Sequence, residues 1–401
     1  MIPYDRTLLS KALAVGDSSK MTLRPAEFLE EADIDYKLKK RVFSLKPAEK
    51  KIICYDGEKV FYDKLLIATG SKVWMPPVEG LDLKGVFPLR SHKDQADIKE
   101  ACIGAKNIVI IGASFIGSEC AAALKMHYKD TATITMVNGD ETPFQLTLGK
   151  ELGAWYQQEH EANGVTVLNK VFMKSANPAD DDAKKVKSVT LHDGTELPAD
   201  VVIMGTGVRP NTAFLEGSGI EMNRDGGLVC DPFMQTNLPN VFAAGDIASV
   251  PYWPTGSRTR IEHWVVALEQ GTNAAFNMLG KYVPYSGIPF FWTRHYNRSL
   301  QFIGNNAVGY DEIVFKGKRS KHKFLAYYIN DKDQVVAVAG MGKPKAMLTL
   351  LEAMEQNCMP KGSDIKSGRE KPRTIKRLLK QNVGGGKCKR ANCCQKKTVV
   401  A

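Results

Sequence analysis

Residues 108–119 constrain the fold of this chain more than any other stretch. The apolar run Ile108–Ile111 fits a buried parallel strand, and it stops at Gly112 before an alanine-rich segment that fits a helix. Such a strand, turn and helix can place the pyrophosphate of a dinucleotide at a helix N-terminus. An ordinary turn between a strand and a helix is the alternative, because a single Gly-rich match is weak evidence.

Each position of this turn has a physical role under the dinucleotide interpretation. Gly112 permits the tight turn, the small Ser114 allows the backbone to approach the phosphates, and Gly117 allows the helix and strand to pack closely. Ser114 stands where the usual pattern has a second glycine. Phe115 and Ile116 lie between Ser114 and Gly117 and complete the predicted cofactor-binding loop.

Three other segments share one theme, a hydrophobic strand that ends in small residues. Each of them could by itself be a buried strand leaving a sheet. Together with the loop at Gly112 they form an ordered set, and the set is more specific than any of its members. The three turns are Ala68-Thr69-Gly70, Gly205-Thr206-Gly207 and Ala243-Ala244-Gly245-Asp246.

With this set, the chain resembles the flavoprotein reductases with two dinucleotide folds, which bind FAD and a nicotinamide nucleotide. Within them it most resembles the apoptosis-inducing-factor-like and ferredoxin-reductase-like branch, and its Rieske-linked apoptosis-inducing-factor-like members. The resemblance implies an α/β fold with two doubly wound dinucleotide-binding domains and a C-terminal α+β interface domain. Its local patterns are Pro3-Tyr4-Asp5-Arg6, Leu9-Ser10-Lys11, Glu141-Thr142-Pro143-Phe144, Met234-Gln235-Thr236-Asn237, Glu262-His263-Trp264 and Phe290-Phe291-Trp292-Thr293.

The resemblance also implies a flavin domain that is interrupted in the sequence. Residues 1–100 and 226–288 would fold together as the FAD-binding domain, and residues 101–225 would be inserted as the NAD(P)-binding domain. Residues 289–360 would form the interface domain and residues 361–401 a flexible basic tail.

One part of the flavin domain is missing from this pattern. The resemblance calls for a strand, a Gly-rich loop and a helix just before Met1, and no such fingerprint precedes Ala68. That unit normally seats the pyrophosphate of FAD. We expect either an incomplete chain or a protein that binds flavin poorly, and we favour incompleteness.

Hydrophobic periodicity predicts several elements. Polar–apolar alternation indicates strands, and longer amphipathic runs indicate helices. The expected strands are Lys51–Cys54, Lys59–Tyr62, Thr133–Val137, Val165–Leu168, Val186–Leu191, Glu312–Phe315 and Phe324–Ile329, and the expected helices lie near Leu148–Ala162, from Glu262 and at Lys345–Gln356.

Charge and cysteine content narrow the functional classes. The net charge of +11 comes entirely from residues 361–401, so the rest of the chain is neutral. This tail is either a solvated terminus or a segment that contacts nucleic acid or anionic lipid weakly. The eight cysteines include no Cys-x-x-Cys, which argues against a dithiol centre and disulfide substrates. Cys388, Cys393 and Cys394 have no nearby histidine, so no metal site is expected.

Lys11 and Glu119 are the expected catalytic residues, and both assignments follow from the resemblance. Lys11 would lie near the N5 edge of the flavin, where its cation would stabilise the reduced ring. Glu119 would open the nucleotide helix just after Gly117 and form a salt bridge with Lys11. The alternatives are a solvated surface lysine and a carboxylate that only faces the helix dipole.

The resemblance places further residues at the cofactors. Arg6 and Arg90 would contact flavin phosphate or ring oxygens through their planar guanidinium groups. Asp246 would accept hydrogen bonds from the ribityl chain, unless it is a plain helix N-cap. The other expected cofactor-binding residues are Thr69, Gly70, Gly207, Glu262, His263 and Trp292, with Phe291 either beside Trp292 or in an aromatic core.

Asn138 bears on the choice of nicotinamide nucleotide. It follows the strand Thr133–Val137, where folds that prefer NAD usually carry a carboxylate. Asparagine can hydrogen-bond the ribose hydroxyl but does not repel a 2′-phosphate. Asp140 and Glu141 lie close enough to disfavour a phosphate, so we expect NAD, with NADP left open.

The sequence therefore predicts an FAD-dependent NAD(P)H oxidoreductase. Hydride would pass from NAD(P)H to the flavin, and electrons would leave singly to an iron–sulfur protein, a quinone or an ascorbyl-type radical. The alternative is a flavin-poor NADH-binding scaffold related to apoptosis-inducing factor. The sequence leaves open whether the protein forms a homodimer. Without a targeting or membrane-spanning segment in this chain, a cytoplasmic or mitochondrial protein is expected.

Overall fold

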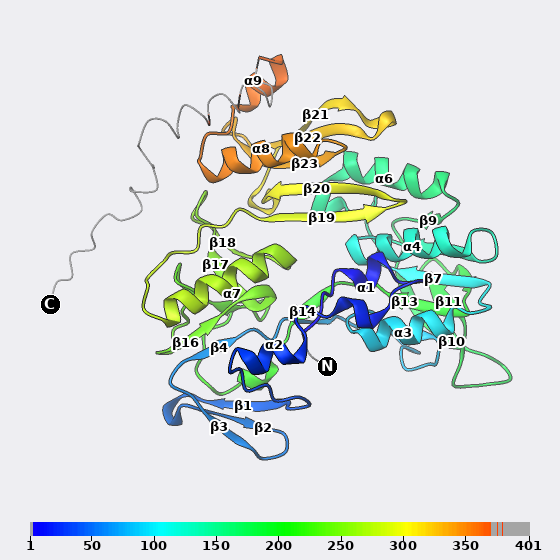
Figure 1. Cartoon of the computed structure of the whole chain (residues 1–401). Helices are drawn as coiled ribbons and strands as arrows, with labels where there is room; N and C mark the ends of the chain where they lie inside the picture. The colour runs from blue at the N-terminus through cyan, green and yellow to red at the C-terminus, as the bar shows by residue number, and fades with distance from the viewer. Residues whose placement is uncertain (1–2, 370–374, 376–378, 380–401) are drawn as a thin grey trace. The chain divides into compact units, whose positions relative to one another are not determined.

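The computed structural model describes residues 3–369 together with Ile375 and Leu379, and it divides the chain into two compact units (Figure 1). The first unit comprises Met1–Pro251, Arg258–Tyr285 and Thr293–Arg298. The second comprises Tyr252–Ser257, Ser286–Trp292 and Ser299–Ala401. The rest of the predicted tail, with Cys388, Cys393 and Cys394, lies outside the described residues.

A five-stranded parallel sheet holds the Gly112 loop in the first unit. Its strand order is β6-β13-β7-β8-β9, and every neighbouring pair is parallel. The central strands are buried on both faces, because residues of α3 and α4 pack on one face and residues 171–191 pack on the other. Helix α4 packs on β7 and β8, α3 on β6 and β13, and α6 on β9. The bounds are β6 Val86–Pro88, β7 Asn107–Ile111, β8 Thr133–Val137, β9 Thr166–Leu168, β13 Val201–Met204, α3 His92–Ala101, α4 Phe115–Tyr128 and α6 Lys150–Ala162.

A smaller parallel pair, β16-β4, is followed by the turns at Thr69 and Asp246, which were expected to belong to the FAD-binding domain. Its neighbour α7 packs on β16, and the core beneath these elements includes Ile67 and Phe242. Three small antiparallel or mixed sheets flank it, with orders β1-β2-β3, β14-β5 and β15-β17-β18. The bounds are β1 Val42–Lys46, β2 Lys51–Cys54, β3 Lys59–Phe61, β4 Leu65–Ile67, β5 Ser71–Val73, β14 Val208–Pro210, β15 Leu228–Val229, β16 Val241–Ala243, β17 Ala248–Pro251, β18 Arg258–Arg260 and α7 Trp264–Met278.

The remaining elements of the first unit are short. Helix α1 packs against α4 and α3, so it brings the N-terminal segment to the helices that cover the five-stranded parallel sheet. A three-stranded antiparallel sheet, β10-β11-β12, contains the expected strand Val186–Leu191 as β11. The bounds are α1 Leu8–Lys11, α2 Ala26–Glu31, α5 Gln145–Leu148, β10 Met173–Pro178, β11 Val186–Leu191 and β12 Glu196–Pro198, with 3-10 turns at Ser18–Met21, Pro47–Glu49, Ala213–Leu215 and Gly245–Ile247.

The second unit is built on a five-stranded sheet of order β19-β20-β23-β22-β21, in which β20, β23, β22 and β21 pair antiparallel. Helix α8 packs on β23 and contributes Met347 and Leu350 to a buried core. The first unit takes in the end of β19, from Thr293 onward. The bounds are β19 Phe290–His295, β20 Arg298–Gly304, β21 Glu312–Lys318, β22 Lys323–Ile329, β23 Val335–Met341, α8 Pro344–Glu355 and α9 Gly362–Ser367, with 3-10 turns at Asn306–Val308 and Arg319–Lys321.

The structure differs from the expected organisation in two places. Strand β6, at Val86–Pro88, pairs with β13, so the sheet expected within residues 101–225 also takes a strand from residues 1–100. The tail expected from residue 361 begins with a helix, α9, and Ile365, Ile375 and Leu379 are buried in the core of the second unit. A count of charge does not detect such apolar residues scattered among lysines.

The predicted fold class is confirmed: a parallel α/β architecture is followed by a C-terminal sheet domain. No helix in the described part of the chain combines the length and apolar character that crossing a membrane requires.

Candidate functional site: a Gly-rich loop and a buried ion pair

The loop between β7 and α4 has the close packing that its glycines predict. Gly112 has a φ of 104°, which favours glycine, and a Cβ there would lie 2.2 Å from the carbonyl oxygen of Gly205. A Cβ on Gly117 would lie 1.9 Å from the carbonyl oxygen of Gly112. Both positions therefore require glycine, because backbone atoms occupy the space that a side chain would fill.

The start of α4 has the features of an anion-binding helix N-terminus. The helix is 14 residues long, and its N-cap, the exposed Ser114, makes no capping hydrogen bond through its side chain. Phe115 packs at 5.2 Å against the ring of Phe144, while Ile116 is exposed. Gly207, across the sheet edge, has open space where a Cβ would lie. These residues fit the phosphates of a dinucleotide.

Asn138 follows β8 and is already engaged within the protein. Its buried amide donates hydrogen bonds to the carbonyl oxygen of Asp140 (3.1 Å) and to Asn169 Oδ1 (2.9 Å). Glu141 forms ion pairs with Lys150 and Lys170, and both lysines lower the pKa of its carboxyl. The negative charge expected near the ribose is therefore partly balanced by two lysines.

Lys11 and Glu119 lie together, as expected. Lys11 ends α1, and its Nζ lies 2.9 Å from Oε1 and 3.1 Å from Oε2 of Glu119. The carboxylate also accepts hydrogen bonds from Ser10 Oγ (2.5 Å) and Thr293 Oγ1 (2.6 Å). Glu119 is 2% exposed and lies in the second turn of α4, which begins at Phe115 and not at Glu119. This ion pair is therefore a buried feature and not a helix-dipole contact.

Three charged side chains converge on Gly70, in one of the turns expected to bind flavin. A Cβ at Gly70 would lie 3.4 Å from Arg90 Nη2, 3.7 Å from Arg6 Nη1 and 3.9 Å from Asp246 Oδ2. Arg90 Nη2 donates to Asp246 Oδ2 at 2.8 Å, so Asp246 is an ion-pair partner inside a 3-10 turn and not a helix N-cap. Thr69, in the same turn as Gly70, donates its hydroxyl to the carbonyl oxygen of Asn211 (2.9 Å). Arg6 and Thr69 are exposed.

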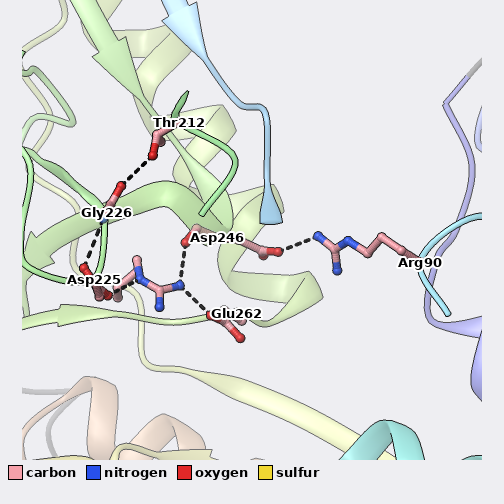
Figure 2. A network of polar contacts seen from close by, with 8 residues as sticks. Arg90, Thr212, Asp225, Gly226, Asp246 and Glu262 are labelled. Carbon is pink, nitrogen blue, oxygen red and sulfur yellow. Dashed lines mark hydrogen bonds and ion pairs between the residues drawn. The ribbon is translucent and has the colours of Figure 1, made fainter. Parts of the chain in front are cut away.

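Arg260 extends this network to the other side of Asp246 (Figure 2). Its Nη1 donates to the main-chain oxygen of Asp246 (2.9 Å) and to Glu262 Oε1 (2.5 Å), and its Nε donates to Asp225 Oδ2 (2.6 Å). Figure 2 shows Asp246 between Arg90 and the turn of Asp225, which Thr212 anchors through the Gly226 carbonyl. The two arginines thus hold Asp246 from both ends.

Glu262 and His263 precede helix α7, which begins at Trp264 with His263 as its N-cap, close to the expected start near Glu262. Desolvation raises the pKa of the Glu262 carboxyl, while the hydrogen bond and ion pair with Arg260 act to lower it. The protein around His263 lowers its pKa to about 4. Both residues lie at the start of α7, and Arg260 links Glu262 to Asp246.

Trp292 and Phe291 belong to the second unit. Phe291 stacks on Phe302 with ring centroids 5.0 Å apart, as an aromatic core residue would. Trp292 packs near Phe290 at 6.3 Å. The expected place of Trp292 beside a flavin stays a prediction, since the structure describes each unit by itself.

Four polar residues of this site were not among the predicted ones. Ser10 and Thr293 bind Glu119, while Asp225 and Arg260 bind around Asp246. Ser10 and Thr293 lie in the Leu-Ser-Lys and Phe-Phe-Trp-Thr patterns, next to residues that were singled out. No local signal identifies Arg260, because its partners come from separate segments.

Two buried histidines predict that the fold is sensitive to acid. Burial lowers the pKa of His160 to about 4 and lowers the pKa of His295 well below its usual value. Both stay neutral in the folded protein, whereas the unfolded chain protonates them below about pH 6.5. The free energy of unfolding should therefore be steady above that pH and fall by up to about 1.4 kcal/mol per pH unit for each histidine between about pH 6 and 5. Urea unfolding at a series of pH values measures this slope. Replacing His295 with phenylalanine should reduce it, and an unchanged slope would contradict the assignment.

Comparisons with known proteins agree with this geometry. Residues 1–271 match the family model described as pyridine nucleotide-disulphide oxidoreductase, and residues 290–367 match the reductase C-terminal model. Apoptosis-inducing factor 3 of Mus musculus is 35% identical over 343 residues, which are 85% of this chain. The chain spans 55% of the length of that relative.

Two further relatives are reductases by name. The ferredoxin reductase subunit of the 5,5′-dehydrodivanillate O-demethylase of Sphingobium sp. is 31% identical and is matched over 86% of this chain and 82% of its own. The structure of the covalent putidaredoxin reductase–putidaredoxin complex is 27% identical, with a TM-score of 0.87, over 95% of this chain and 90% of that chain.

The expected resemblance to the apoptosis-inducing-factor-like and ferredoxin-reductase-like branch is confirmed. The Gly-loop, the buried ion pair and the matched sequence point to one family. The chain belongs to the pyridine nucleotide-disulphide oxidoreductase family.

Proposed function

We propose that this chain is an FAD-dependent NAD(P)H oxidoreductase that takes hydride from NAD(P)H and passes electrons to a one-electron acceptor. The observation that carries the proposal is the buried pair of Lys11 and Glu119, held on the helix that follows the Gly112 loop. A buried cation next to a nucleotide-binding helix can stabilise negative charge that develops during reduction.

FAD, when bound, supplies a ring that accepts two electrons as hydride and can release them one at a time. The residues of this chain provide binding and electrostatics. Gly112, Ser114 and Gly117 would hold the nicotinamide nucleotide pyrophosphate, and Arg6 with Arg90 would bind the flavin next to Gly70.

The cysteines favour an acceptor other than a disulfide. Cys54, Cys102, Cys120 and Cys230 are buried free thiols, and burial raises the pKa of Cys102 and Cys230 to about 12. A buried, protonated thiol is a poor nucleophile. One named relative is a ferredoxin reductase subunit, and one solved structure joins a putidaredoxin reductase to putidaredoxin, which supports an iron–sulfur protein as the acceptor of this chain.

We also propose that NAD is preferred over NADP. Support comes from the buried Asn138, whose amide hydrogens are used within the protein, and from the carboxylate of Glu141 nearby. Lys150 and Lys170 act against this preference. Titration with NADH and NADPH tests it, and tighter binding of NADPH would contradict it.

The test of the main proposal is the colour of the purified protein. We expect a visible flavin absorption band, present as isolated or after incubation with FAD, that bleaches on anaerobic addition of NADH. Bleached protein should then reduce a ferredoxin. A protein that stays colourless with FAD, or a flavin band that NADH leaves unchanged, would contradict the proposal.

One observation supports a second candidate, an NADH-binding scaffold with little flavin. Within the described residues, the parallel sheet next to the Gly112 loop has five strands, whereas the parallel sheet on the flavin side has two. Two strands offer less support to a cofactor. A colourless protein that still binds NADH would favour this candidate over the reductase.

A further inference from the structure

The carboxylate of Glu119 has more hydrogen-bond donors than an ion pair needs. Oε1 accepts from Thr293 Oγ1 (2.6 Å) and lies 2.9 Å from Lys11 Nζ, while Oε2 accepts from Ser10 Oγ (2.5 Å) and from the same Nζ (3.1 Å). Both oxygens therefore carry one hydroxyl donor and share one ammonium. The torsion of this carboxylate is fixed from two sides.

Burial makes these donors important. Glu119 is 2% exposed, Ser10 2% and Thr293 1%, so water does not replace a lost donor easily. A carboxylate withdrawn from water needs hydrogen bonds or a paired cation to remain charged. The Lys11 side chain is 14% exposed, so its ammonium is the part of the cluster nearest to solvent or to a ligand.

Thr293 is itself held rigidly, although it lies 174 residues from Glu119 in sequence. Two residues further along the same face of β19, His295 packs between Phe144 and Tyr156 with ring centroids at 5.7 and 5.0 Å. The next residue, Tyr296, forms a hydrogen bond of 2.7 Å through its hydroxyl with His160 Nδ1.

A last contact anchors the segment Thr293–Arg298. Arg298 Nη1 pairs with Glu159 on α6 at 3.2 Å. The segment Thr293–Arg298 is thus attached to α6 at two consecutive residues, Glu159 and His160. Because this segment is anchored, the Thr293 side chain is already ordered, and little side-chain entropy is lost when its hydroxyl bonds to Glu119.

We propose that Thr293 and Ser10 are positioning residues for the redox site, which fix Glu119 and through it the Lys11 ammonium. The proposal rests on the function proposed above and adds to it that the strand β19 sets the position of the catalytic cation. Neither hydroxyl transfers a proton or touches substrate in this role. Each acts by removing the freedom of the carboxylate.

The kinetic test uses Thr293→Val, which removes the hydroxyl and keeps the shape, together with Thr293→Ser, which restores a hydroxyl. In the FAD-loaded protein we expect Thr293→Val to lower kcat for reduction by NADH about tenfold while the KM for NADH changes less than about twofold. Thr293→Ser should return kcat to within about threefold of the wild type. Ser10→Ala should resemble Thr293→Val and provides a second test if that variant folds poorly.

A buried threonine elsewhere in the first unit supplies the matched control. Thr236 is 8% exposed, and its hydroxyl donates to the main-chain oxygen of Val241 and accepts from the main-chain amide of Leu238. Thr236→Val makes the same chemical change, and it should leave kcat and KM unchanged. Equal losses in Thr236→Val and Thr293→Val would show a general effect of removing a hydroxyl and would overturn the proposal.

A structural test works without flavin. Crystal structures of the wild type and of Thr293→Val, grown under one condition, should show Glu119 rotated and the Lys11 ammonium displaced in the variant. An unchanged Lys11–Glu119 pair would overturn the proposal. A wild-type protein that binds no flavin would contradict the proposed function instead, and the crystal comparison alone would then decide whether Thr293 positions the pair.

Discussion

Replacing Glu119 with glutamine, or Lys11 with methionine, should slow the reduction of bound flavin by NADH by about 10²- to 10³-fold, the loss typical of removing a preorganised charge at a reacting centre. Glutamine keeps the shape of Glu119 but leaves the Lys11 ammonium without its paired charge. Methionine removes the cation itself. Stopped-flow absorbance of the flavin band at saturating NADH measures the rate constant.

A surface ion pair provides the control for this experiment. Lys93 and Asp97 pair at 2.5 Å on the exposed face of α3, with side chains 74% and 39% exposed. Exposed pairs of this kind contribute little to stability, so Lys93→Met and Asp97→Asn should leave the rate unchanged. If Glu119→Gln reduced flavin as fast as Asp97→Asn, the buried pair would have no part in the chemistry.

Replacing Gly117 with alanine should destabilise the first unit by about 3 kcal/mol or more and abolish measurable NADH binding. The new Cβ would lie 1.9 Å from the carbonyl oxygen of Gly112 and 2.9 Å from its carbon, and backbone atoms cannot move aside as a flexible side chain can. The helix α4 would be pushed away from β7, and the anion-binding turn would open. Thermal unfolding and a fluorescence titration with NADH report the two effects.

Gly271 is the matched control for Gly117. It lies inside α7, and a Cβ there would have no heavy atom within 4 Å. Alanine is the better helix former, so Gly271→Ala should stabilise the protein by about 0.5–1 kcal/mol. If the two variants shifted the unfolding midpoint in the same direction, the steric explanation of Gly117 would be wrong.

Elements with a strong local pattern could be predicted from the sequence. The strands at Lys51–Cys54 and Thr133–Val137 form over those residues, because their periodicity is set by neighbours along the chain. Short strands were missed: β6 at Val86–Pro88 has only three residues, and its place depends on pairing with β13 more than 100 residues away. Such pairing leaves no periodic signal.

The residues of the candidate site also divide into those that a local sequence pattern identifies and those that it does not. The Gly112 loop is local, so its residues could be identified from spacing alone. The pairing of Lys11 with Glu119 was expected only through the resemblance, and the Arg260 network was not expected at all. Arg260 joins Asp225, Asp246 and Glu262, which approach one another only after β15, β17 and β18 have formed a sheet.

The path of β19 has a consequence for exchanging parts between relatives. One strand supplies Trp292 to the second unit and Thr293 to the first, so no boundary placed before this strand leaves the first unit whole. A chimaera joined near residue 271, where the first family match ends, would import a foreign neighbour for Glu119 along with the new C-terminal part. A junction after Arg298 would keep the native partner, and hybrid enzymes spliced there should retain the hydride-transfer properties of the N-terminal parent.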